Sequence, residues 1–260
     1  MTIATSASAS ATSVVQRASG SRTKINLTAF QYPSGYRGIN YGAQLDRLRR
    51  DLGITLTGDT ARGPARGMGL PQHAEHFFAI PDWGMIASNQ NEALKIVLAA
   101  LARKLGTNFA MMGISIDDQH MREHDATTMA LLTHHARQPR NKVRMLPAQF
   151  GARYKGGQRL RDVRSTCLGS VNGEFGLNAY TVAVMLLTHP ERLLTKKPTF
   201  CIRCPGTEYS IAGDGDFASC PIFGVVNGQI RFTAVKDVLG GNKAVFGAAT
   251  GFVLPELIAS

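Results

Sequence analysis

Charged residues are scarce in this sequence, acidic ones above all, and long apolar runs are missing. Only 18% of the 260 residues are Asp, Glu, Lys or Arg, whereas soluble domains average roughly 25%. No run of about eighteen apolar residues occurs, so we expect a soluble protein without a membrane-spanning helix. The chain is long enough to bury a core without disulfides or metal ions.

Cysteine is scarce as well. The chain has four cysteines, and its N-terminus lacks the apolar core of a secretory signal peptide. A secreted framework held by disulfides is therefore not expected. We expect free thiols in an intracellular, reducing compartment, with import into an organelle left open. The four residues are Cys167, Cys201, Cys204 and Cys220.

The common catalytic patterns are also missing. The sequence contains no dinucleotide-binding or P-loop glycine pattern, no Gly-x-Ser-x-Gly, no His-Glu-x-x-His and no kinase signature. Internal repeats and heptad arrays are absent too. The motifs therefore predict no cofactor, and they leave open whether the protein is an enzyme.

The charge that is present is strongly one-sided. The chain has 29 Lys and Arg against 18 Asp and Glu, a formal net charge of +11, and such an excess attracts polyanions. In residues 1–25, which are mostly Ser, Ala and Thr, the only charges are Arg17, Arg22 and Lys24. We expect this tail to be disordered, because it offers little apolar area to bury. Organellar transit peptides and the arms of assembly proteins share this composition.

Residues 26–260 are expected to form a single α+β domain, with its helices in the first two thirds. The clearest helix begins after Asn89, which can cap it, and ends before Gly106. His189 stands at the end of the last helix, where a partial positive charge is favourable. The expected helices are Tyr41 to Leu52, Asn89 to Leu105, Asp117 to about His135, and Asn178 to His189.

After Pro198 the pattern becomes typical of strands. Asn227-Gly228 lies between two of them and predicts a type I′ hairpin turn, because both turn positions need a positive φ. The expected strands are Thr199 to Cys204, Pro221 to Val226, Gln229 to Val235, and Ala244 to Val253. Helices followed by strands predict an α+β fold with a small antiparallel sheet in the last third.

The densest basic segment is 137–164, which has nine Lys or Arg against Asp162 alone. Gly156-Gly157 and two aromatic residues are interleaved, so guanidinium groups, amides and stacking rings could meet one phosphate chain. A helix beginning after Gly157 would add an anion site at its N-terminus. The alternatives are a solvated basic face that binds no ligand and arginines that pair within the protein. The predicted nucleic-acid-binding residues are Arg153, Lys155, Arg159, Arg161 and Arg164.

These patterns favour a basic binding or assembly protein that contacts nucleic acid or another polyanion. One alternative is a metal-assisted hydrolase or nuclease that uses Asp214, Asp216 and Glu208, although a plain Gly/Asp turn is the commoner explanation for the first two. Another alternative is a structural component of a particle or filament. The sequence does not distinguish RNA from DNA and does not fix the oligomeric state.

Cys201 and Cys204 have the spacing of a zinc knuckle. A complete site would need a second pair, but Phe223 stands where the partner of Cys220 would be. The sequence therefore predicts buried free thiols and less than stoichiometric zinc, and it assigns no metal ligands.

Overall fold

The computed structural model describes residues 38–56, 69–135, 143–151, 158–170, 173–193, 201–226, 228–236 and 246–253. Within these ranges the chain forms five α-helices and two mostly antiparallel sheets, a mixed α+β arrangement. The predicted tail of residues 1–25 lies outside them. Among the described helices none is long and apolar enough to cross a membrane.

Capping residues set the ends of the first two helices. α1 (Tyr41–Leu52) ends at Gly53, whose φ of 67° lies in the left-handed region that glycine adopts without strain. α2 (Gln90–Leu105) begins after Asn89, whose side chain accepts a hydrogen bond from the Glu92 amide at 2.9 Å. Both helices have the predicted bounds, because local signals determine where they begin and end.

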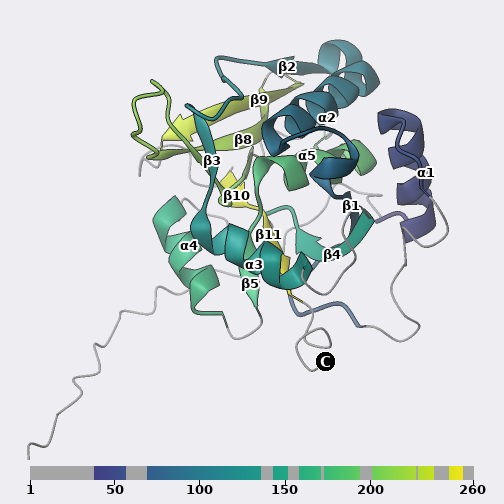
Figure 1. The fold of residues 1–260 in the computed structure, drawn as a ribbon, viewed down its shortest axis with the longest axis horizontal. Coiled ribbons are helices and arrows are strands. Elements are labelled where there is room, and N and C mark those ends of the chain that lie inside the picture. The colour runs from purple at the N-terminus through teal and green to yellow at the C-terminus, as the bar shows by residue number, and fades with distance from the viewer. Residues whose placement is uncertain are drawn as a thin grey trace, which may run out of the picture.

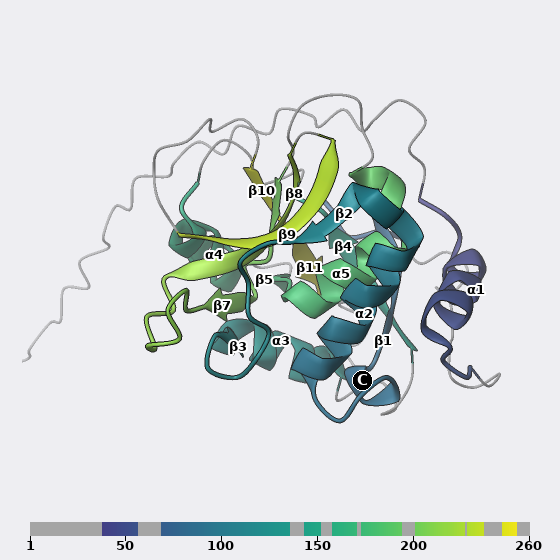
Figure 2. The same ribbon diagram turned by 90° about the horizontal axis from the view of Figure 1, so that it is seen from above.

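The fifth helix forms the centre of the molecule. In α5 (Ala179–Thr188) every residue is buried, as the nearly complete lack of a polar face predicts. α2 and α1 both pack against it, and it lies in the middle of the molecule in both ribbon views (Figures 1 and 2).

The smaller sheet has four strands in the order β1-β4-β11-β5. These strands are β1 (His76–Pro81), β4 (Val143–Gln149), β5 (Glu174–Gly176) and β11 (Thr250–Phe252). β11 is an inner strand that pairs antiparallel with both β4 and β5. Its pairing with β4 stops at Ala148, and the next residue of β4 is Pro147, which has no N–H to donate.

The larger sheet has seven strands, and two of its pairings are parallel, β2 with β9 and β6 with β10. The strands are β2 (Phe109–Met111), β3 (Met121–Glu123), β6 (Cys201–Arg203), β7 (Thr207–Tyr209), β8 (Ser219–Val226), β9 (Gln229–Lys236) and β10 (Phe246–Ala248). β8 and β9 are antiparallel, with Val226 opposite Gln229. Gly228 has a φ of 76°. Asn227 lies outside the described residues, so the type I′ turn stays a prediction.

The helix-first order is not confirmed, because strands β1 to β5 alternate with the helices before α5. The helix expected from Asp117 is shorter: α3 is Asp125–His135, and β3 precedes it. The Asp117 carboxylate accepts hydrogen bonds from the Gln119 and His120 amides and closes a turn there.

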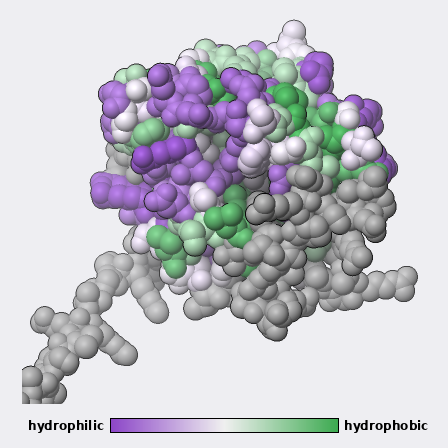
Figure 3. All heavy atoms as spheres, viewed as in Figure 1, coloured by the Kyte–Doolittle hydropathy of each residue, from purple (hydrophilic) through white to green (hydrophobic). Residues whose placement is uncertain are grey.

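The helices α3 and α4 (Leu160–Leu168) pack against β5. Three apolar side chains on them are exposed, Met129, Leu132 and Leu168. Figure 3 shows hydrophilic residues over the upper left of this face and smaller apolar patches below them, near α3 and α4.

Candidate functional site

Three of the five predicted nucleic-acid-binding residues are described. Arg159, Arg161 and Arg164 lie on or next to α4, whereas Arg153 and Lys155 lie outside the described residues. α4 begins at Leu160, shortly after the two glycines, so a helix starts where the anion-site hypothesis requires one.

The N-terminus of α4 has no side-chain cap. Arg159 occupies the N-cap position without a capping hydrogen bond. The Arg161 side chain is 69% exposed and lies 3.7 Å from the Asp162 carboxylate. A helix N-terminus carries a partial positive charge, and the two arginines add to it. Asp162, in the first turn, offsets part of this charge.

The Arg164 side chain forms its hydrogen bonds within the protein. Its Nε donates to the Pro205 carbonyl at 2.8 Å, and its other nitrogens reach the Thr207 carbonyl and the Glu208 carboxylate. The side chain is mostly buried. Arg164 therefore pairs within the protein, as one alternative to ligand binding predicts. The Arg161 side chain, in contrast, is exposed.

The positive charge is unevenly distributed along the chain. The described residues contain fifteen Lys or Arg and fifteen Asp or Glu, so their formal charges cancel. The remaining segments contain fourteen Lys or Arg and three Asp or Glu. They therefore carry the whole net charge of +11.

The described residues that border three of these segments lie close together. Cys201 pairs with Phe246 in neighbouring strands, Leu160 packs in a cluster with Cys201, and a Cβ added to Gly151 would meet the Gly247 backbone at 2.9 Å. We call these residues, with Arg159 and Arg161, the basic end. The bordered segments are 152–157, 194–200 and 237–245, which contain Arg153, Lys155, Lys196, Lys197 and Lys243 against Asp237.

Arg203 adds charge to the basic end. Its side chain is buried, and its guanidinium lies 5.5 Å from the centre of the Phe246 ring. The Nε has no hydrogen-bond partner, and no carboxylate within the described ranges forms an ion pair with this arginine. Among the described carboxylates, none therefore offsets the positive charge of Arg203 through an ion pair.

Two of the three carboxylates of the hydrolase hypothesis, Glu208 and Asp214, accept hydrogen bonds from other protein groups. Glu208 accepts a hydrogen bond from Arg122 at 2.7 Å. Asp214 accepts from the Asp216 amide and the Ser210 hydroxyl, and these bonds lower the pKa of Asp214. In the part of the chain that the structure describes, no three His, Cys, Asp or Glu side chains are grouped to hold a metal ion. The geometry thus gives this alternative no support.

All four cysteines are buried thiols that form no disulfide bond. Cys201 packs with Cys220 and Ile222 in a small cluster, whereas Cys204 belongs to the main core. Burial raises the pKa of the Cys201 and Cys204 thiols, which disfavours the thiolate that zinc requires. Substoichiometric zinc stays a prediction for metal analysis.

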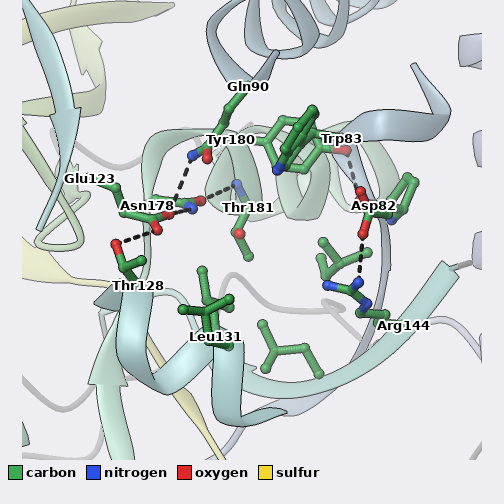
Figure 4. A pocket seen from close by; sticks show the side chains of 14 residues that line it. Asp82, Trp83, Gln90, Glu123, Thr128, Leu131, Arg144, Asn178, Tyr180 and Thr181 are labelled. Carbon is green, nitrogen blue, oxygen red and sulfur yellow. Dashed lines mark hydrogen bonds and ion pairs between the residues drawn. The ribbon is translucent and has the colours of Figure 1, made fainter. Parts of the chain in front are cut away.

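A separate cavity of about 210 Å³ lies among α2, α3, α5 and the strands β1 and β4. Figure 4 shows two polar groups at opposite sides of it, with Leu131 between them: Glu123 with its hydrogen-bond partners on one side, and Asp82 with Arg144 on the other. Trp83 and Tyr180 contribute aromatic rings to the lining.

Asp82 and Arg144 neutralise each other. Arg144 Nη2 lies 2.5 Å from Asp82 Oδ2, and only 5% of the Arg144 side chain is exposed. Asp82 also accepts a hydrogen bond from the Gly84 amide, which starts a 3-10 turn at Trp83. The Nε of Arg144 is buried without a hydrogen-bond partner, and burial lowers the pKa of this guanidinium.

Glu123 is surrounded by neutral donors. Its Oε1 accepts from Asn178 Nδ2 at 2.5 Å and from Gln90 Nε2 at 3.4 Å, and its Oε2 accepts from Thr128 Oγ1 at 2.7 Å. Among the described Lys, Arg and His residues none forms an ion pair with this carboxylate. Asn178 also caps α5 by accepting from the Thr181 amide.

No family model, curated protein or solved structure matches the chain.

The cavity was not predicted from the sequence. Its polar residues come from five separate segments of the chain, and no spacing in the sequence relates them. One local signal for the cavity was present in the sequence. Arg144 is the only charged residue of the buried strand β4, and a buried charge requires a partner, which indicates a polar group nearby.

Proposed function

We propose that this chain binds nucleic acid, or another polyanion, through its basic end, as a non-enzymatic binding or assembly protein. The distribution of charge carries this proposal. The described fold is formally neutral, whereas the segments outside it hold all of the excess positive charge, and three of them border the basic end. Polyanion binding draws on such a local excess.

The start of α4 supports the same surface. The partial positive charge of a helix N-terminus suits a phosphate oxygen, and Arg159 and Arg161 lie at this one. Guanidinium groups bind phosphate through two parallel hydrogen bonds. Arg164 is left out of the contact set, because its donors are bound to the Pro205 and Thr207 carbonyls and to Glu208.

The test is the salt dependence of binding to labelled oligonucleotides, measured by fluorescence anisotropy. Each phosphate contact contributes a slope of about −0.7 for single strands and about −0.9 for duplex in log affinity against log salt. Changing Arg159 and Arg161 together to Ala should reduce the magnitude of the wild-type slope. The reduction should be at most about the contribution of two phosphate contacts.

The matched control is the double change Arg49→Ala and Arg50→Ala. It removes the same charge from exposed positions on α1, which lies on the opposite side of the molecule from α4 (Figures 1 and 2). The control should keep the wild-type slope. Equal flattening by both pairs would refute a localised basic end, and no binding by the wild type at about 50 mM salt would refute the proposal itself.

The same titrations separate the remaining alternatives. Parallel series with RNA and DNA show whether the 2′-hydroxyl contributes to affinity. A component of a particle or filament would in addition assemble on the nucleic acid, which light scattering of the samples detects.

A further inference from the structure

We propose that the cavity in Figure 4 binds a flat organic cation, such as an aromatic amidine, whose nitrogen group pairs with Glu123 and whose ring lies against Trp83 and Tyr180. This site is independent of the basic end: none of its lining residues belongs to α4, β6 or β10.

Charge selects the class of ligand. The lining contains three formal charges, those of Asp82, Glu123 and Arg144. Arg144 and Asp82 form an ion pair at 2.5 Å, so the carboxylate of Glu123 leaves the lining with one net negative charge. A cation therefore gains from entering the cavity, and an anion does not.

Glu123 lies beside the N-termini of two helices, and no Lys, Arg or His of the described residues forms an ion pair with it. The N-termini of α2 and α5 both lie beside it, through Gln90 and Asn178, and partial positive charges at helix N-termini favour a carboxylate. A carboxylate has about four acceptor positions, and three donors from the described residues reach this one, the Gln90 amide only at 3.4 Å. One position on Oε2 remains for a ligand N–H, and a bond from a cationic donor is stronger than one from a neutral donor.

The rest of the lining fits a flat ring. The Tyr180 hydroxyl donates to the Pro81 carbonyl at 2.8 Å, which fixes this ring, while Trp83 is 39% exposed. Leu131 lies below them in Figure 4. Aromatic rings attract cations through their faces. A volume of about 210 Å³ admits a one-ring or two-ring molecule and is smaller than typical drug-binding pockets.

Trp83 provides the readout, since it is the only tryptophan of the chain. Titration with benzamidine should give a saturable change in its fluorescence. Benzamide has nearly the same shape without the charge, and benzoate carries the opposite charge. Both should bind at least about 10-fold more weakly, because they lack one charge-assisted hydrogen bond.

The variant Glu123→Gln should weaken benzamidine binding by at least about 10-fold. Glu92→Gln is the matched control, because it removes an exposed carboxylate of α2 that pairs with Lys95, and it should bind as the wild type does. Leu131→Phe keeps Glu123 and reduces the cavity, so it tests the site even if Glu123→Gln fails to fold, and it should also weaken binding.

Three results would overturn the proposal. They are the absence of a saturable change with the folded wild type, binding of benzamide or benzoate as tight as that of benzamidine, and wild-type affinity in both the Glu123→Gln and Leu131→Phe variants.

Discussion

His189 is fully buried, and its hydrogen bonds require a neutral ring. Its Nε2 accepts from the Ile39 amide at 3.3 Å, so the proton sits on Nδ1, which donates to the Thr188 hydroxyl at 2.9 Å. Burial, reinforced by the neighbouring His76 and Arg47, lowers its pKa to about 3. The favourable helix C-terminus expected from the sequence is outweighed by this desolvation.

We predict that His189 makes the protein less stable in acid. The unfolded state has a pKa near 6.5 for this group and the folded state about 3, so between these values the unfolded chain binds more protons. The free energy of unfolding should therefore fall as pH is lowered from about 6.5 towards 3, by roughly 4 kcal/mol in total from this residue.

Urea unfolding midpoints of the wild type and His189→Gln, measured across this pH range, test the prediction. Contributions of the carboxylates and of the other histidines are common to both proteins and cancel in the difference. The variant should show the shallower pH dependence. Parallel curves would mean that His189 does not control acid stability.

Among the elements, the tightest junction lies between the two sheets. Gly206, in the turn between β6 and β7, donates to the Leu177 carbonyl at 2.9 Å. A Cβ at this position would lie 2.5 Å from the Gly176 carbonyl oxygen and 2.7 Å from the Asn178 nitrogen. Backbone atoms cannot move aside as a flexible side chain can, so only glycine fits.

We predict that Gly206→Ala destabilises the fold by about 2–4 kcal/mol, since the turn must move away from the start of α5. Gly42→Ala is the opposite case: its Cβ would meet only the Asn40 side chain, at an ordinary 3.5 Å, and alanine favours the α1 helix by about 0.5 kcal/mol. Denaturant melts of both variants test this. Equal effects would mean that the junction adapts to a methyl group.

Local signals explain which elements were predictable. α1, α2 and α5 have capping residues and either an apolar stripe or a wholly apolar surface, and all three form as predicted. β1 and β4 were missed, because they are buried on both faces and do not alternate, and β4 contains Arg144 and Pro147. The cavity depends on contacts between distant segments, which no local pattern encodes.

For the molecule as a whole, β11 is the strand on which the smaller sheet depends. It lies between β4 and β5, and the Thr250 hydroxyl donates to the buried Glu174 carboxylate at 2.6 Å. We predict that a chain ending after Ala249 loses cooperative thermal unfolding, because two strands lose their common partner. A chain ending after Val253 retains β11 and is the control. Calorimetry of the two truncated chains measures this, and a cooperative transition in the shorter one would contradict it.

The inner position of β11 also affects how the protein is made. On the ribosome, β1, β4 and β5 emerge long before residues 250–252, so the facing edges of β4 and β5 have no partner while synthesis continues. In the same way, the partner residues of β2 in β9 are synthesised 121 residues later. Unpaired edges of a nascent chain are sites of aggregation. This topology therefore delays completion of the smaller sheet until β11 has been synthesised, and until then the open edges of β4 and β5 need protection from other chains.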